Sequence, residues 1–490
     1  MPQHIGTAGI TALTLALTAI AAKGEDQHWD IENPPGDTHE VRIDTTEGTW
    51  VSVDVSPDGK LIAFDLLGDL YLMPIGGSAD GGAVTKLTTG MAWDMQPRFS
   101  PDGRAIAFTS DRLGASGKSG DNIWTLGIGA DDAWGTDDDA FTQITNETYR
   151  LLNGPAWHPS GEYIVARKHF TSRRSLGAGE MWMYPSAGLD AGASGGLQMT
   201  DRPTEQKDVN EPVFSPDGRY LYFSEDASPG STFEYNKDSN KQIYVINRLD
   251  TVTGRQERYV SGPGGACRPT PSPDGKKLAF VRRVGPQSTL FVMDTNSGAI
   301  EPVFGELERD MQEAWAIHGV YPTMAWTLDS ESIVLWARGT IKRVDIESGE
   351  ATEIPFRVRD TRKISRPLET PQAPAPERFD VRVLQDVAVS LDGRHAAYSA
   401  LGRVYLKPLE PVGSTTAEAR RLTEQSEHFE FDPAFSRDGS MIAWVTWDDE
   451  QLGSIRVGRL DASGRVTRSW QVNSTPGHFT NPVFSPDGSR

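Results

Sequence analysis

The sequence has little of what a disulfide-stapled or zinc-binding protein needs. Of its 490 residues one is a cysteine, Cys267, so no disulfide can form within the chain. The 9 histidines are scattered, and no two of them lie within two positions of each other. The chain therefore lacks the His-x-His, His-Glu-x-x-His and Cys-pair patterns that hold zinc. We expect no cofactor and no catalytic site in this chain.

Positive charge is also scarce. Lys and Arg number 48 against 68 Asp and Glu, which gives a formal net charge of −20. Such a field repels polyanions and argues against nucleic acid or an anionic membrane as a partner. Hydrophobic residues make up 37% of the chain, and 49 Gly and 32 Pro fall at turns rather than in one block. This composition is typical of a loop-rich β-protein.

What the sequence does have is one repeated motif, Ser-Pro-Asp-Gly. Full copies stand at residues 56–59, 100–103, 215–218, 272–275 and 485–488. Weaker copies, marked by the Asp or its substitute, bring the total to nine anchors, at Asp58, Asp102, Ser160, Asp217, Asp274, Asp329, Asp392, Asp438 and Asp487. A repeat of roughly 40–60 residues is typical of blade-type arrays.

Each anchor predicts a tight turn between two strands. Pro fixes φ, Asp bonds to the backbone two residues on, and Gly takes a positive φ. An alternating strand such as residues 61–64 or 105–108 follows the turn, and two further strands complete the unit. Four antiparallel strands per repeat make the blade of a β-propeller. The fold class is therefore all-β, with eight complete blades and the start of a ninth.

The boundaries follow from composition. Blades one to six occupy residues 40–356, a Pro-rich insertion or linker 357–378, and blades seven, eight and the start of the ninth 379–490. Either one large ring or a six-bladed ring followed by part of a second ring fits this order, and we favour the single ring. A blade opens at residues 481–488 and does not continue, so we expect the sequence to be part of a longer protein.

The amino-terminal residues 1–22 read as an export signal, because an apolar run ends in the small-x-small cleavage pattern Ala19-Ile20-Ala21. Residues 1–4 contain no Lys or Arg, which departs from the usual signal. A membrane anchor is the alternative, but the run is short, so we expect no stable span and a periplasmic or secreted protein. Residues 23–39 read as a linker, and a strand at 40–44 is expected to close the ring against the last blade.

The Phe-Ser-Pro-Asp-Gly-x-x-Ile-Ala-Phe run, followed by Ile-Trp or Ile-Tyr and Leu-Thr, resembles the TolB-type (WD-repeat-like) propeller. Non-repeat segments at residues 29–36, 167–177, 233–238 and 310–313 resemble the propeller half of exported bacterial amidohydrolases. In that family a metal-dependent catalytic barrel follows the propeller. The resemblance implies that a divalent metal such as zinc would sit in a downstream domain that is missing from this sequence.

Two clusters are candidate sites. A basic set could hold an acidic partner or a substrate carboxylate if it faces the channel or the top surface, although pairing with the many carboxylates of this acidic chain is favoured. Its members are Arg167, Lys168, Arg173, Arg174, Arg282 and Arg283. An acidic loop offers oxygen ligands for a hard cation such as Ca²⁺, although a solvated hairpin is favoured. Its members are Asp131, Asp132, Asp137, Asp138 and Asp139. The Gly-x-Ser-x-Gly string at 192–196 lacks the strand and helix of a nucleophile elbow, so it is interpreted as a hairpin.

These observations predict a non-catalytic propeller region of an exported amidohydrolase-type protein, acting as scaffold, substrate-access filter or protein-interaction surface. Its partner would be the protein's own missing carboxy-terminal domain or another envelope protein, with a peptide or small molecule as substrate. One alternative is a stand-alone periplasmic TolB-type binding propeller. The other is the propeller of a prolyl-oligopeptidase-like serine peptidase. The fold alone does not choose among them.

Overall fold

A computed structural model describes residues 30–34, 36–114, 117, 120–171, 177–188, 195–234, 238, 241–314, 316–366, 374–409 and 418–490. The predicted signal at residues 1–22 lies outside this described part. The chain divides into two compact units, Met1–Pro367 and Leu368–Arg490. Within the described residues every regular element is a β-strand, so the predicted all-β class is confirmed.

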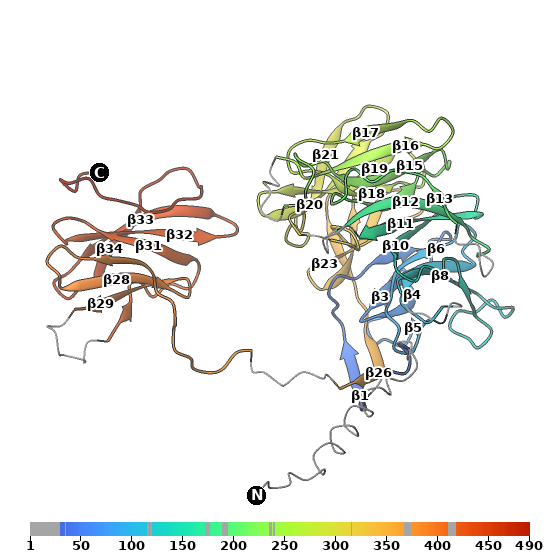
Figure 1. Ribbon diagram of the computed structural model, residues 1–490, viewed down its shortest axis with the longest axis horizontal. Coiled ribbons are helices and arrows are strands. Elements are labelled where there is room, and N and C mark those ends of the chain that lie inside the picture. The colour runs from blue at the N-terminus through green and yellow to red at the C-terminus, as the bar shows by residue number, and fades with distance from the viewer. Residues whose placement is uncertain are drawn as a thin grey trace, which may run out of the picture. The chain divides into compact units, whose positions relative to one another are not determined.

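Unit 1, Met1–Pro367, contains six four-stranded antiparallel sheets in chain order (Figure 1). Blade one comprises β2 (Val53–Val55), β3 (Leu61–Leu66), β4 (Asp69–Pro74) and β5 (Thr85–Lys86). Blade two comprises β6 (Asp94–Phe99), β7 (Ala105–Ser110), β8 (Asn122–Gly127) and β9 (Ala140–Gln143). Blade three comprises β10 (Leu151–Trp157), β11 (Tyr163–Thr171), β12 (Gly177–Pro185) and β13 (Leu197–Gln198).

The remaining blades of unit 1 repeat this plan. Blade four comprises β14 (Val209–Phe214), β15 (Tyr220–Asp226), β16 (Tyr244–Asp250) and β17 (Gln256–Val260). Blade five comprises β18 (Cys267–Pro271), β19 (Lys277–Val284), β20 (Gln287–Asp294) and β21 (Ile300–Phe304). Blade six comprises β22 (Ala325–Trp326), β23 (Ser332–Ala337), β24 (Thr340–Asp345) and β25 (Ala351–Ile354).

The anchor turns form as their sequence predicts. In blade one, Ser56 Oγ donates to Asp58 Oδ1 at 2.7 Å, and the same carboxylate oxygen accepts from Lys60 N at 3.1 Å. Gly59 adopts a φ of 72°, which a residue with a Cβ rarely takes. The Asp58 carboxylate therefore stabilises the turn that connects the innermost strand of the blade to its second strand.

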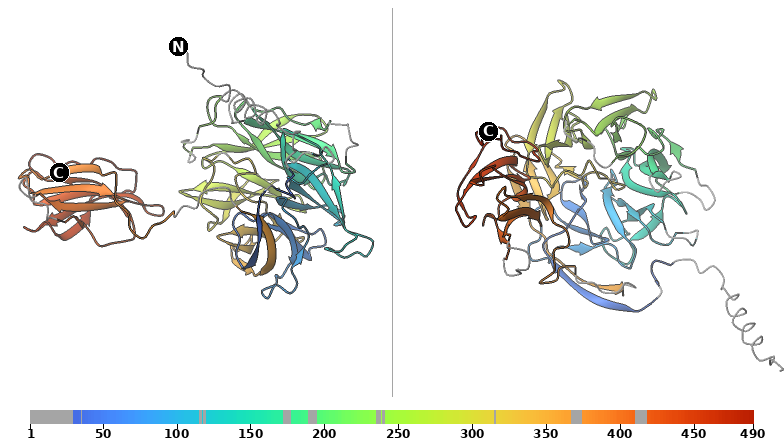
Figure 2. Two further views of the ribbon diagram at one scale, coloured as in Figure 1. Left: turned by 60° about the horizontal axis from the view of Figure 1, so that its bottom comes forward. Right: turned by 60° about the vertical axis from the view of Figure 1, so that its left-hand side comes forward.

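The six blades of unit 1 close on themselves. Blade one and blade six share a hydrophobic cluster that includes Val53, Phe64, Trp336 and Phe356. Val53 N donates to Thr323 O at 3.1 Å across the same junction. The right-hand view of Figure 2 shows the sheets following one another around a common centre. The single larger ring that we favoured from the sequence is therefore wrong, because blade six already packs against blade one.

The strands that enter and leave the ring pair with each other. β1 (Thr38–Thr45) runs antiparallel to β26 (Val358–Ser365), with Thr38 opposite Ser365 and Thr45 opposite Val358. Within the predicted Pro-rich insertion or linker at residues 357–378, Val358–Ser365 form β26, whose alternating exposed and half-buried side chains form this ribbon. The expected closing strand also differs, since β1 pairs outside the last blade rather than within it.

Unit 2, Leu368–Arg490, holds two blades. Blade seven comprises β27 (Gln385–Val389), β28 (His395–Ala400), β29 (Arg403–Pro408) and β30 (Arg420–Arg421). Blade eight comprises β31 (Phe429–Phe435), β32 (Met441–Asp448), β33 (Leu452–Leu460) and β34 (Val466–Gln471). They meet in one cluster around Ala397, Leu406 and Trp444. The ninth repeat forms its anchor turn, with Ser485 Oγ donating to Asp487 Oδ1 at 2.6 Å.

No helix in the described part of the chain has the length and apolar character that crossing a bilayer demands.

Candidate functional site

The inner strands of blades two to five share a bend at their centre. Residues directly before a proline take a left-handed conformation at Gln96, Glu211 and Arg268, with φ of 59°, 59° and 54°. Gly154 does the same in blade three, with φ of 62°. The strand pairing shifts register at these points, so each is a β-bulge. The bulges hold polar side chains in the middle of the ring.

A segment of the long connection between β21 and β22, residues 316–321, fills the centre. Gln96 Nε2 donates to His318 O at 2.8 Å, and Asn153 Nδ2 donates to Ile317 O at 3.1 Å. Asn210 Nδ2 donates to Ala316 O at 3.0 Å and to Ile317 O at 2.8 Å. These donors stand on the inner strands of blades two, three and four. A segment reached from three successive blades lies on the ring axis, and we call it the channel segment.

A buried ion pair fixes the other end of the channel segment. Glu211 Oε1 accepts from Val320 N at 2.6 Å, and Arg268 Nε donates to Tyr321 O at 2.7 Å. Arg268 Nη2 lies 3.3 Å from Glu211 Oε1, and both side chains are almost fully buried. Burial lowers the pKa of Arg268, which the adjacent carboxylate opposes. The pair closes one end of the channel: backbone groups bond to Glu211 Oε1 and to Arg268 Nε, while Arg268 Nη2 makes no hydrogen bond with the described residues.

The other end of the channel is open. A cavity of about 430 Å³ is lined by the last residues of the inner strands and by the anchor turns. We call it the mouth cavity. All six blades contribute to it, with Val55, Arg98, Trp157, Val213, Pro273 and Trp326 as one residue from each. Its wall is largely apolar, which suits a site that binds a ligand or a partner segment.

One ion pair marks the polar part of the mouth cavity. Arg98 Nη1 lies 3.4 Å from Asp54 Oδ1, and Asp54 Oδ2 accepts from Phe99 N at 2.7 Å. Burial raises the pKa of Asp54, while Arg98 acts in the opposite direction. A ligand with both an apolar body and a charged group would find complementary surface here.

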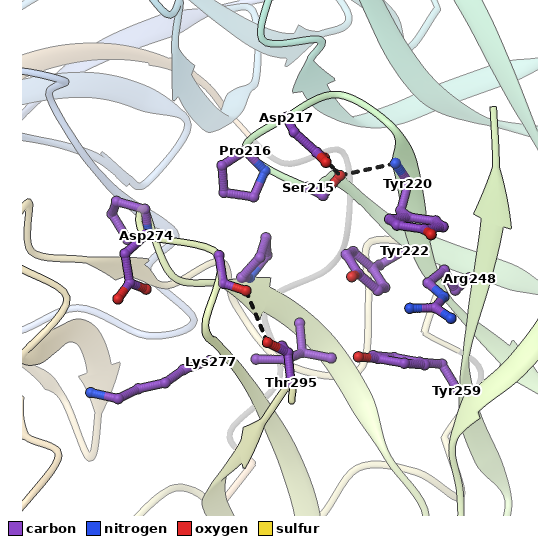
Figure 3. A pocket seen from close by; sticks show the side chains of 14 residues that line it. Ser215, Pro216, Asp217, Tyr220, Tyr222, Arg248, Tyr259, Asp274, Lys277 and Thr295 are labelled. Atoms are coloured by element: carbon purple, nitrogen blue, oxygen red, sulfur yellow. Dashed lines mark hydrogen bonds between the residues drawn. The ribbon is translucent and has the colours of Figure 1, made fainter. Parts of the chain in front are cut away.

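A second cavity, of about 420 Å³, opens between blades four and five (Figure 3). Tyr220 and Tyr259 cover the guanidinium of Arg248, with ring centroids 4.4 Å and 4.2 Å from its carbon. Arg248 Nε also donates to Glu257 Oε1 at 3.0 Å. Burial raises the pKa of the adjacent Tyr222 to about 12. Arg248 in this wall is neutralised by Glu257, but Asp217, Asp274 and Lys277 also line the pocket, so it presents aromatic, hydroxyl and charged groups.

The predicted basic residues of blade three are engaged inside the protein. Arg167 is fully buried, and its Nη2 lies 2.5 Å from Asp208 Oδ2. Burial and the charge of Arg167 lower the pKa of His169 to about 4, so its Nδ1 accepts from Arg167 Nη2 at 2.9 Å. Lys168 pairs with Glu147 and lies 4.4 Å from the Trp182 ring centroid. Arg173 and Arg174 lie outside the described residues.

Arg282 and Arg283 of blade five also have local partners. Arg282 Nε donates to Gly265 O at 2.7 Å, and burial lowers its pKa. Arg283 Nη1 lies 3.2 Å from both Asp310 Oδ2 and Glu313 Oε1. The structure therefore places the described basic candidates in separate ion pairs and backbone contacts rather than in one binding surface.

The acidic loop binds its own backbone. Asp138 Oδ2 accepts from Ala130 N and Asp139 Oδ2 accepts from Gly135 N, each at 2.7 Å. Asp131 Oδ1 accepts from Ala133 N at 2.9 Å, Asp132 pairs with Arg104, and Asp137 is exposed. Among the described residues no three His, Cys, Asp or Glu side chains are placed to hold a metal ion. Ser194 of the Gly-x-Ser-x-Gly string lies outside them.

The residues that hold the channel segment were missed in the sequence. Gln96, Glu211 and Arg268 each precede a proline in an inner strand, and this recurring x-Pro pair is the signal that could have drawn attention to them. Asn153 directly precedes Gly154, and Asn210 directly precedes Glu211, the residues in the left-handed conformation in blades three and four. Their common function is visible only once the ring brings them together.

No family model matches the chain. It is 25% identical over 239 residues to the uncharacterized peptidase YuxL of Bacillus subtilis (strain 168), which covers 48% of this chain and 29% of that protein. It is 33% identical over 114 residues to the uncharacterized protein Atu1656 of Agrobacterium fabrum (strain C58), which covers 22% of this chain and 33% of that protein. The chain thus spans a third or less of the length of these relatives.

Solved structures with similar folds include TolB of Acinetobacter baumannii, with 16% identity, a TM-score of 0.44 and coverage of 64% of both chains. A puromycin-hydrolyzing peptidase of Mycobacterium tuberculosis shows 14% identity and a TM-score of 0.40, and covers 75% of this chain and 51% of its own. The similar structures include TolB proteins and peptidases. By its own strand pairing, the chain is an all-β protein of the β-propeller fold.

Proposed function

We propose that this chain is the non-catalytic propeller region of an exported amidohydrolase-type protein, where it acts as a scaffold and protein-interaction surface. The observation that carries the proposal is the asymmetry of the channel in unit 1. Residues 316–321 are bonded across one end, and the mouth cavity at the other end is lined by six blades. A channel closed at one end is suited to receive a segment of a partner rather than to pass a substrate through.

The amidohydrolase part of the proposal rests on the resemblance of residues 29–36, 167–177, 233–238 and 310–313. Residues 310–313 belong to the connection that leads into the channel segment, and Asp310 there pairs with Arg283. In this proposal residues 310–313, the matching segment that leads into the channel segment, support the closed end of the channel. The catalytic metal would be bound by a domain outside this sequence.

The interaction surface is tested with a photo-crosslinking residue at Leu328, which lines the mouth cavity and is 60% exposed. The matched control is Val252, which is 81% exposed and is absent from the lining of that cavity. We expect specific crosslinks to the rest of the parent protein, or to one envelope protein, from position 328 and none from position 252. Equal capture at both positions would overturn the proposed surface.

A second candidate function is the propeller of a serine peptidase. The 239-residue match to an uncharacterized peptidase favours it. Sequencing the gene beyond the codon for Arg490 separates the candidates. A barrel with His-x-His supports the amidohydrolase-type protein, and a nucleophile elbow followed by Asp and His supports the peptidase. Completion of the ninth blade followed by a stop codon supports a stand-alone TolB-type binding protein.

A further inference from the structure

A third cavity in unit 1, of about 230 Å³, lies between blades one and two at the amino-terminal ends of their inner strands. We call it the tryptophan pocket. Trp50, Asp65, Trp93 and Asp94 line it, and His318 of the channel segment forms part of its wall. The mouth cavity lies at the opposite, carboxy-terminal ends of the same strands. The two cavities are therefore separate sites.

Asp65 is a buried carboxylate without a cation. Its Oδ1 accepts from Ser52 N at 2.7 Å, and its Oδ2 accepts from Gln96 N at 2.8 Å. In the described part of the chain no Lys, Arg or His forms an ion pair with it. Burial raises its pKa to about 6, because the hydrogen bonds offset only part of the cost of desolvation. A positive charge entering the pocket would offset the rest.

Asp94 supplies a second, independent indication. Its side chain is fully buried, and Oδ2 lies 2.7 Å from Arg112 Nη2. Oδ1, however, makes no hydrogen bond with the described residues, although a buried carboxylate oxygen normally has a partner. Because Asp94 lines the pocket, this unpartnered oxygen leaves negative charge beside it, which a bound cation would offset.

Two tryptophans give the pocket aromatic walls. Trp50 packs against Tyr321 and Trp336, with ring centroids 6.0 Å and 6.3 Å apart. Trp93 is 51% exposed, yet its position is fixed, because its N donates to Asp111 Oδ1 at 2.6 Å. Its ring lies over Gly68, where a Cβ would approach within 2.8 Å. Indole faces attract cations, and tryptophan does so most strongly.

The surroundings carry further negative charge. Burial raises the pKa of Asp111, and the nearby carboxylates Asp121 and Glu32 raise it further. Two arginines stand beside the pocket. Arg112 is neutralised by Asp94 and covered by the Phe141 ring, whose centroid is 4.1 Å from its carbon, and Arg362, which donates to Leu67 O, is neutralised by Asp69 and Asp360. A metal ion is not indicated, because no cluster of three potential ligands occurs among the described residues.

We propose that the tryptophan pocket binds an organic cation, an alkylammonium group small enough to fit between Trp50 and Trp93 above Asp65 and Asp94. The volume of about 230 Å³ is below the usual range for whole drug-sized ligands. It suits a small amine or the ammonium end of a larger molecule. The site is independent of the scaffold function proposed above.

The test follows tryptophan fluorescence of the full chain during titration with tetramethylammonium chloride and with methylammonium chloride. Sodium chloride keeps the ionic strength constant, and tert-butanol serves as a neutral compound of similar shape. We expect a saturable change with at least one of the two ammonium ions and none with tert-butanol. An equal response to tert-butanol, or no saturable change with either ion, would overturn the proposal.

Two variants locate the response. Asp65→Asn removes the charge at nearly constant shape, and Trp93→Ala removes one aromatic wall at an exposed position. Each is expected to weaken binding by about tenfold or more. Trp134→Ala is the matched control, because Trp134 packs against Phe99 and does not line this pocket. If Asp65→Asn does not fold, the titration of Trp93→Ala tests the proposal alone. Unchanged binding of the ammonium ion by Trp93→Ala contradicts the proposal.

Discussion

The residue before each anchor serine occupies the same place in every blade, but its environment differs between the two units. Phe99 in unit 1 is 7% exposed and packs on the strands of blade one. Phe214 is 5% exposed and packs on blade three. Val389, its counterpart in blade seven of unit 2, is 57% exposed. Blade seven opens its unit, so no earlier blade of unit 2 covers this residue.

The comparison shows that the repeat sequence determines the strands of a blade but does not determine how far the apolar side chains of those strands are buried. Phe435 of blade eight has a neighbour and packs against the shared cluster of unit 2, whereas Val387 and Val389 of blade seven are exposed. The apolar side chains of a blade are buried by the blade that precedes it. In a closed ring every blade has a preceding blade. Calorimetry of the full chain can test this, because two separate units are expected to give two unfolding transitions.

The largest effect is expected for Phe99→Ala. The change removes a buried aromatic ring between blades one and two and leaves a cavity. The free energy of unfolding of unit 1 should fall by about 3–4 kcal/mol. The first readout is the transition of unit 1 in calorimetry, with the transition of unit 2 as the internal control. A loss below about 1 kcal/mol would contradict the packing described here.

The next effect depends on pH. The pKa of Asp65 in the folded protein, about 6, lies above the ordinary value of 3.8, so folding favours its protonated form. The resulting stabilisation is complete below about pH 4 and is lost as the pH rises through about 6. The difference in stability between wild type and Asp65→Asn should change by about 3 kcal/mol across this range. Denaturant unfolding at several pH values measures it, and a constant difference would contradict the raised pKa.

A smaller effect is expected for Gly319→Ala in the channel segment. Gly319 has a φ of +100°, and an added Cβ would lie 2.1 Å from Arg268 Nη2. Unit 1 should lose about 2–3 kcal/mol through backbone strain and displacement of the buried ion pair. Gly161→Ala is the control, because φ there is +76° but nothing lies within 4 Å of the new Cβ. Equal losses for the two variants would mean that the channel segment is not tightly held.

The smallest effect is expected for Val389→Ala. The side chain is already exposed, so its truncation should change the stability of unit 2 by less than about 0.5 kcal/mol. The calorimetric transition of unit 2 provides the measurement, and Trp444→Ala, in the core of that unit, provides the positive control. A large loss for Val389→Ala would show that another surface covers blade seven in solution.

Local chemistry explains why the blades could be predicted. The contacts within an anchor, such as Ser56 to Asp58 and Lys60 to Asp58, span two residues, so the local sequence is enough to predict them. The alternation of residues 105–108 likewise predicts β7. Eight repeats of this pattern are enough to predict the fold class.

The site could not be predicted because its contacts are remote in sequence. Gln96 and His318 are 222 residues apart, and the bond from Thr323 Oγ1 to Val53 O spans 270 residues. The number of blades in the ring depends on the second of these junctions. Arg167 is a candidate binding residue in the sequence, but its partner Asp208 stands 41 residues away, and nothing near Arg167 in the sequence identifies that carboxylate.

The pairing of β1 with β26 has a consequence for synthesis. Thr38 and Ser365 meet only after all six blades have been made, so β1 waits as an unpaired strand while the ring grows. Such a strand is a target for aggregation. Its sequence, Thr-His-Glu-Val-Arg-Ile-Asp-Thr, interrupts every apolar residue with a charge. Those charges act as gatekeepers that keep the nascent chain soluble until its last strand arrives.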